Sequence, residues 1–144
     1  MVFIFVQSAL PSELSSKESG FIVDWIMRAF ENVLPYDQET IVFAVRKGAH
    51  FTEYLVLGAA LVPAVKEWRE ASGFRGAESA LASWMIGTAY AVTDEFHQTF
   101  APGRSCELRD MMIDSCGVLT GVLAASLAGW IMARRAMENE IPDD

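Results

Sequence analysis

The feature that most constrains this chain is a long apolar stretch near its C-terminus. From Met111 to Ala133 the sequence is almost entirely apolar, and Asp114 is the only charged residue in it. A helix rises about 1.5 Å per residue, so a stretch of this length crosses the roughly 30 Å hydrocarbon core of a bilayer. The stretch therefore predicts a transmembrane helix, which its flanks extend to residues 106–135.

Two other segments predict helices of the same kind. Residues 38–65 follow a helix-breaking segment that begins at Pro35, and they are nearly all apolar from Phe51 onward. Residues 77–100 are apolar from Ala80 to Val92. Both carry charges at one end, so they cross a bilayer only if those ends reach the interface or a cavity lined by protein. A mean hydropathy of +0.25 and an apolar content of 52% agree with a membrane protein.

The N-terminal part predicts two weaker elements. Residues 1–10 are apolar but too short to span, and they lack the basic flank and cleavage site of a secretory signal, so we expect a short or truncated first helix. In residues 21–34 apolar side chains recur at helical spacing, with Asp24, Arg28 and Glu31 on the other side. This helix either lies in the plane of the membrane interface or packs on the remaining helices.

The predicted fold is therefore all-α. It is a polytopic membrane helix bundle with three strong transmembrane helices, a short N-terminal helix and an amphipathic interfacial helix. Residues 1–137 form one domain, and the acidic residues 138–144 form a disordered tail.

Basic residues near the span ends predict the orientation. Cytoplasmic loops are enriched in lysine and arginine. Two basic groups fall on the same side of a four-span layout, namely Lys66, Arg69 and Arg75 after the second span and Arg134 and Arg135 after the last. We therefore expect both termini in the cytoplasm and a multi-pass protein of the cell membrane.

Charge and cysteine content exclude some classes of function. The net charge is −8 and no basic run is present, which argues against a nucleic-acid partner. Cys106 and Cys116 do not form a disulfide framework, and no CxxC zinc motif occurs. We expect Cys116, in the apolar stretch, to be a packing residue.

Ionisable and polar residues gather in three segments of the chain. They are Arg46, Lys47, His50, Glu53 and Tyr54 in the first segment, Tyr90, Asp94, Glu95, His97 and Gln98 in the second, and Arg104, Ser105, Arg109, Asp110 and Asp114 in the third. Helical spacing places many of them on shared faces. In the four-span layout all three segments lie on the outer side, so we expect one polar site facing the extracytoplasmic space.

A structural explanation of these residues stands beside a functional one. Charges in a bilayer need partners, and a static ion-pair network that fixes helix packing would supply them. The number of histidines, carboxylates, arginines and tyrosines at one level favours a functional site. Gly117 and Gly121 instead predict close helix packing, and Ser105 could serve only as the N-cap of the last helix.

The order of these motifs is similar to a known family. The segments RKGAHFTEYLVLG and AYAVTDEFHQTFAPGRSCELRDMMIDSCGVLTGVL resemble the VanZ-like family over roughly residues 43–123, and FVQSALPSELSSKESG resembles the start of its members. The resemblance implies a small polytopic membrane protein of the cell envelope. The family name comes from a protein linked to antibiotic resistance, against teicoplanin, and a remote similarity to lipid head-group enzymes such as phosphatidylserine synthases has been proposed.

One hypothesis is an enzyme that acts on a lipid-linked phosphate ester by head-group exchange or hydrolysis. The catalytic candidates are His50, Asp94, His97 and Asp110. The candidates for substrate binding are Arg46, Lys47, Glu53, Tyr54, Tyr90, Glu95, Gln98, Arg104, Ser105, Arg109 and Asp114. A carboxylate would orient the histidine or hold a divalent cation, and the sequence leaves the choice of cofactor open.

Two alternatives do not require catalysis of that kind. In the first, the same residues bind a membrane lipid head group, a lipid-linked cell-wall precursor or a lipoglycopeptide such as teicoplanin, and so alter its access. In the second, the protein is a small transporter or proton relay. The transporter or proton relay ranks lowest of the three hypotheses, because no polar path is visible across the apolar ends of the helices.

Overall fold

The computed structural model describes Gly20, Asp24 and residues 38–71, 77–102 and 106–139. Within these residues the chain is helical and contains no strand. The helices are α3 (Gln38–Ala71), α4 (Ala77–Gln98) and α5 (Leu108–Asn139). The predicted helices at 1–10 and 21–34, apart from Asp24, lie outside the described residues.

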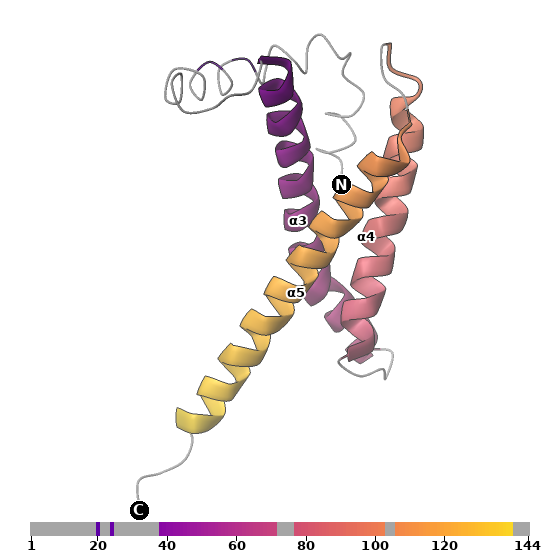
Figure 1. Ribbon diagram of the computed structural model, residues 1–144. Coiled ribbons are helices and arrows are strands. Elements are labelled where there is room, and N and C mark those ends of the chain that lie inside the picture. The colour runs from indigo at the N-terminus through magenta and orange to yellow at the C-terminus, as the bar shows by residue number, and fades with distance from the viewer. Residues whose placement is uncertain (1–19, 21–23, 25–37, 72–76, 103–105, 140–144) are drawn as a thin grey trace, which may run out of the picture.

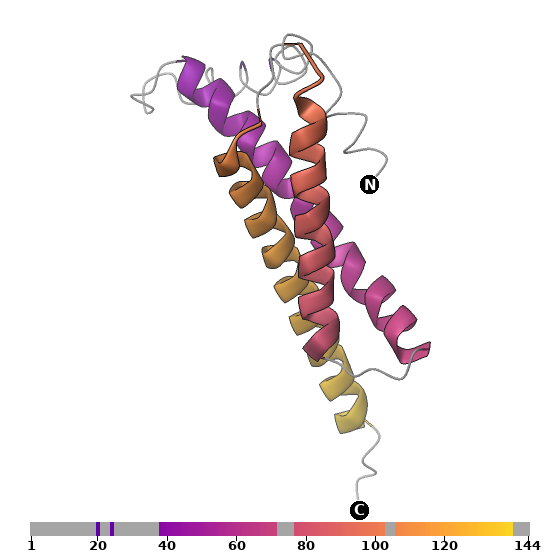
Figure 2. The ribbon, with the colours of Figure 1, turned by 90° about the vertical axis from the view of Figure 1, so that its right-hand side faces the viewer.

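The three helices run up and down as a bundle. Figure 1 and Figure 2 show that α3 and α5 point in the same direction and that α4 runs in the opposite direction beside them. The N-terminal ends of α3 and α5 therefore lie at the same end of the bundle as the C-terminal end of α4. The C-terminal half of α5 extends beyond the other two helices (Figure 1).

The observed helices are longer at two ends than the sequence predicts. Helix α3 contains Pro63 and continues past residue 65 to Ala71 through the charged segment that begins at Lys66, whose residues are good helix formers. Helix α5 continues to Asn139, and Glu138, expected in the tail, pairs with Arg134 at 3.2 Å. Helix α4 ends at Gln98 and is followed by a turn in which Ala101 N–H donates to the Gln98 carbonyl.

Helix α5 packs most extensively on α3, and two glycines allow the close approach. A side chain at Gly117 would meet the Phe51 carbonyl oxygen, and one at Gly121 would overlap the Leu55 carbonyl oxygen. Gly58 on α3 faces the Val118 backbone in the same way. The predicted packing role of the two α5 glycines is confirmed.

Several charged side chains are buried in the bundle, while many large apolar side chains are exposed. The buried polar and charged residues include Asp94, Glu95 and Asp114, each 2% exposed. Large apolar side chains instead cover the outside, including Met85, Phe96, Phe100, Met112, Leu123, Leu127 and Trp130. Such an outer surface is stable in a lipid environment and unfavourable in water.

Among the described residues, two helices are long and apolar enough to cross a membrane. They are residues Glu39–Trp68 of α3 and Leu108–Asn139 of α5. Helix α4 is less apolar than these two helices, since it carries Glu78, Asp94 and Glu95.

Cys116 is exposed on the outside of α5, so the prediction that it is a packing residue is wrong. It lies about 200° around α5 from Asp114, which faces inward.

Candidate polar site

The three polar segments of the sequence come from the ends of helices that meet at one end of the bundle. The first lies in the N-terminal half of α3, the second at the C-terminal end of α4, and the third at the start of α5 (Figure 1). Of the fifteen candidate residues, thirteen are described. Arg104 and Ser105 lie outside the described residues.

An ion pair joins α3 to α5. The Lys47 Nζ atom bonds the Asp110 Oδ2 atom, and both side chains are largely buried. The Asp110 Oδ1 atom is also buried, and no donor among the described residues reaches it. A buried charge is stable only when it is paired, so each of these two residues depends on the other.

A hydrogen bond joins α3 to α4 about two helical turns further along α3. The Tyr54 hydroxyl donates to Asp94 Oδ2 over 3.1 Å, and Gln98 Nε2 lies 3.4 Å from the same oxygen. All three side chains are buried. The Tyr90 ring lies beside that of Tyr54, with 6.3 Å between the ring centroids. Asp94 is thus held by donors from two helices.

Glu95 has a position that the face pattern of the sequence did not give. It is as buried as Asp94, and its Oε2 atom accepts a hydrogen bond of 3.2 Å from the backbone N–H of Glu107. The Glu107 carbonyl in turn accepts from the N–H groups of Asp110 and Met111 at the start of α5. A carboxylate at a helix N-terminus satisfies a free donor and complements the helix dipole. Glu95 therefore fixes the start of α5.

Asp114 is the innermost carboxylate of the cluster. It lies in α5 one turn below Asp110, is 2% exposed, and interacts electrostatically with Asp94, Glu95 and Lys47. The core of Leu57, Val118 and Val122 follows directly below it. Asp114 therefore marks the boundary between the polar end of the bundle and its apolar core.

The two histidines lie at the margin of this cluster. His50 Nδ1 is 3.9 Å from Glu53 Oε2, and Glu53 also interacts electrostatically with Asp94. The His97 ring is half-buried at the end of α4, with its centroid 6.4 Å from that of Phe100. His50 thus belongs to the side of the cluster formed by α3, and His97 to the side formed by α4.

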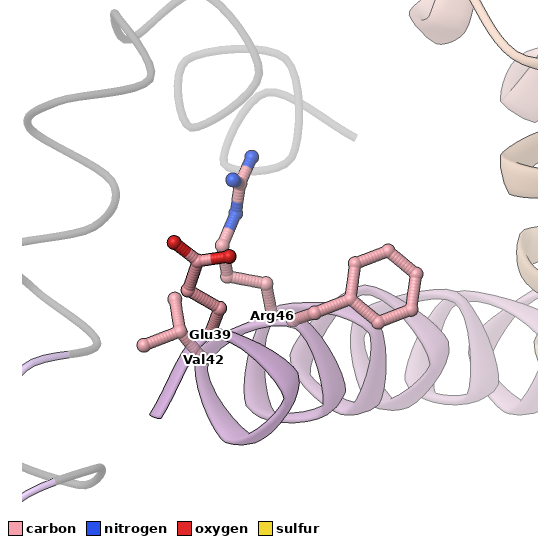
Figure 3. A pocket seen from close by; sticks show the side chains of 4 residues that line it. Glu39, Val42 and Arg46 are labelled. Atoms are coloured by element: carbon pink, nitrogen blue, oxygen red, sulfur yellow. The ribbon is translucent and has the colours of Figure 1, made fainter. Parts of the chain in front are cut away.

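The arginines lie outside the buried cluster. Arg109 is exposed, lies 3.5 Å from Glu107, and its guanidinium carbon is 4.8 Å from the centre of the Phe43 ring. Arg46 lines a cavity of about 340 Å³ together with Glu39, Val42 and Phe43 (Figure 3). Arg46 and Arg109, the rim of the site, thus lie apart from the buried carboxylates, and Lys47 both contacts the Phe43 ring and bonds Asp110.

A second group of polar side chains joins α4 to α5 below this end, and the sequence analysis missed it. Trp84 Nε1 donates to Ser115 Oγ over 3.2 Å, and the Thr88 and Ser115 hydroxyls are 2.9 Å apart. Ser79 and Ser83 are buried further along α4. Polar side chains thus continue toward the other end, against our expectation, although the Ser83 hydroxyl bonds its own helix at the Ser79 carbonyl. Small hydroxyl residues in an otherwise apolar helix were the available signal.

No metal site is defined by the part of the chain that the structure describes. There, no three histidine, cysteine, aspartate or glutamate side chains are arranged to hold a metal ion. The carboxylates instead use protein donors: Lys47 for Asp110, Tyr54 for Asp94, and a backbone N–H for Glu95. The cluster can therefore hold charge and position protons with its own groups.

The fold and the site together define a class of protein. Two apolar helices long enough to span, an apolar outer surface and a buried polar cluster at one end indicate a helical membrane protein. The family model VanZ/LLP1 matches residues 1–129, so the chain belongs to the VanZ/LLP1 family. No curated protein and no solved structure matches the chain.

Proposed function

We propose that this protein is a membrane enzyme that acts on a lipid-linked phosphate ester, by head-group exchange or hydrolysis. One observation carries the proposal. Three helices bring the Lys47–Asp110 ion pair, the Tyr54–Asp94 hydrogen bond and the buried Asp114 to one end of the bundle. Ionisable groups are costly in a membrane protein and are usually functional there.

The rim and the buried cluster suit different parts of such a reaction. Arginine and lysine bind phosphate oxygens through charge-assisted hydrogen bonds, and Arg46, Lys47 and Arg109 are the described cations near the site. In the proposed reaction, His50 or His97 takes the proton of an attacking hydroxyl. The hydroxyl oxygen forms a bond to phosphorus, the bond from phosphorus to the leaving oxygen breaks, and that oxygen receives a proton from the site.

The origin of the attacking hydroxyl distinguishes the two reactions. If it belongs to water, the product is a hydrolysed ester. If it belongs to an alcohol, the head group is exchanged. In the proposed reaction, Asp94 and Asp110 orient either the histidine or the attacking hydroxyl. Carboxylates that hydrogen-bond a histidine fix its orientation in this way in many sites. The proposal includes a multi-pass arrangement with this end on the extracytoplasmic side, which the basic residues at the other end of α3 and α5 support.

A second candidate is a binding module without turnover. It is favoured by the mutual satisfaction of the site: Lys47 neutralises Asp110, and Glu95 accepts a backbone N–H, so these groups already have partners without a ligand. Such a site would bind a lipid head group, a cell-wall precursor or a lipoglycopeptide. Its residues would then discriminate between ligands and would make or break no bond.

Reconstitution separates the two candidates. The full chain is placed in liposomes of mixed phospholipids, and the lipids are analysed by mass spectrometry over time. We expect converted lipids with the wild type, and none with Asp94→Asn or His97→Ala. The matched control is Thr52→Val, since the exposed Thr52 hydroxyl only bonds the Gly48 carbonyl. Ligand binding by folded protein without any change in the lipids would favour the binding module.

A further inference from the structure

A cavity beside the buried cluster carries a more specific inference about the ligand. It is open, measures about 340 Å³, and among the described residues is lined by Glu39, Val42, Phe43 and Arg46 from the first turns of α3. This volume is near the lower end of the range for small-molecule sites. The cavity lies on α3, beside the ion pair rather than within it.

The depth of this cavity can be derived from the length of α3. Its apolar span Glu39–Trp68 has 30 residues, which is about 45 Å of helix against roughly 30 Å of hydrocarbon. If the excess is shared between both ends, about 7 Å of helix at each end lies in the head-group layer. Glu39 then lies among the head groups, and Arg46 lies near the boundary with the hydrocarbon.

The lining residues offer two opposite charges and an apolar wall. Figure 3 shows the Arg46 guanidinium and the Glu39 carboxylate extending to the same side of the helix, and Phe43 and Val42 supply apolar lining. A guanidinium matches the geometry of phosphate oxygens, and a carboxylate pairs with an ammonium group. A ligand that satisfies both carries a phosphate and an amine.

Phe43 connects this cavity to the cluster. Its ring is contacted by Lys47 Nζ at 5.4 Å from the centroid and by the Arg109 guanidinium carbon at 4.8 Å. Cations above an aromatic ring are held electrostatically, so Phe43 keeps both near the cavity. Lys47, whose Nζ atom bonds Asp110, directly follows Arg46 in α3, so the cavity and the ion pair use the same turns of this helix.

We infer that Arg46 and Glu39 form a recognition site for a zwitterionic phospholipid head group, with the phosphate at Arg46 and the amine at Glu39. The role of this site in admitting a substrate rests on the proposed function, but lipid binding at the site can be measured without turnover. The ligand is a membrane lipid because the cavity is at head-group depth beside the apolar surface of α3.

Binding to the purified full chain in detergent micelles tests the inference by native mass spectrometry. The lipid probes are phosphatidylethanolamine and phosphatidylglycerol, and the soluble probes are phosphoethanolamine and inorganic phosphate. We expect the wild type to bind phosphatidylethanolamine about tenfold more tightly than phosphatidylglycerol, and the soluble probes far more weakly. Arg46→Gln should weaken both lipids about tenfold, because it removes a charge-assisted hydrogen bond. Glu39→Gln should remove only the preference.

Matched controls lie at the opposite end of the helices. Arg135→Gln and Glu67→Gln change exposed charges of the same kind and should leave both affinities unchanged. Equal binding of the two lipids by the wild type, equal effects of Arg46→Gln and Arg135→Gln, or tight binding of soluble phosphoethanolamine would overturn the inference. Specific lipid binding with no lipid conversion would instead reject the enzymatic function and leave the recognition site in place.

Discussion

The two ends of α5 differ in how they satisfy their charges. At its start, Asp110 pairs with Lys47 of α3, and Asp114 is buried near the carboxylates Asp94 and Glu95 of α4. At its end, Arg134 pairs with Glu138 one turn away on the same helix, and both are about 61% exposed. The charges at the start of α5 thus find partners on other helices, whereas those at its end find partners within α5.

This contrast shows which part of the molecule depends on tertiary structure. In the Lys47–Asp110 pair, removal of one partner leaves the other charge largely buried and unpaired, which is expensive. Near Arg134, water or lipid head groups can replace a lost partner, and the exposed Trp130 ring lies under the guanidinium at 5.6 Å, as in interfacial belts. The first region therefore depends on contacts between helices, and the second depends only on neighbours within α5.

The largest expected effect tests whether α3 and α5 must pack closely for the polar end to exist. Gly121→Val should destabilise the bundle by about 3 kcal/mol, near the upper end for overpacking, since its side chain would overlap the Leu55 backbone. Unfolding of the purified protein in detergent measures it. Gly129→Val is the control, because nothing lies within 4 Å of a Cβ at Gly129. Equal destabilisation by both variants would contradict the packing of α3 on α5.

A smaller effect is expected within the polar end. Tyr54→Phe removes the donor to Asp94, and the loss of a hydrogen bond to a buried charged group costs about 1.5–3 kcal/mol. Thr52→Val, on the exposed side of the same helix, should cost less than about 0.5 kcal/mol. The comparison is made by unfolding in detergent. If the two variants were equally stable, the buried Tyr54–Asp94 bond would not stabilise the fold.

The hydroxyl contacts between α4 and α5 lie between the two regions in position and in expected effect. Ser115→Ala removes the bonds to Trp84 and Thr88, and hydrogen bonds between membrane helices average about 0.6 kcal/mol each. We therefore expect a loss of about 1 kcal/mol. A double-mutant cycle with Trp84→Phe measures the coupling. Zero coupling energy would show that the two side chains contribute independently.

The sequence predicted the helices better than it predicted their buried faces. Apolar length and end charges placed all three described helices within a few residues, because these features are local. Helical periodicity placed Asp94 on a polar face but did not single out Glu95 as buried. Helix α4 packs against both α3 and α5, so its buried arc is wide enough to include Asp94 toward Tyr54 and Glu95 toward Glu107.

The sequence also did not predict which side chains on different helices form ion pairs or hydrogen bonds with one another. The order of the helices brought Lys47 and Asp110 to the same end, but whether Lys47 would bond Asp110 or Asp114 depends on the position of α5 along α3, which the contacts of Gly117 and Gly121 with α3 fix. The rotation of α5 about its own axis turns Ser115 toward Trp84. Short polar residues give a weak signal in an apolar helix, so these contacts needed the three-dimensional arrangement.

The smallest expected effect lies at the far end of α5 and sharpens the comparison from that side. Arg134→Gln breaks the pair with Glu138, but exposed pairs four residues apart contribute only about 0.3–0.5 kcal/mol. The free energy of unfolding in detergent should therefore fall only slightly at low salt. At high salt, where the ion pair is screened, it should equal that of the wild type. A loss comparable to that of Tyr54→Phe would mean that this end is buried in an assembly, and then both ends of α5 would depend on tertiary or quaternary contacts.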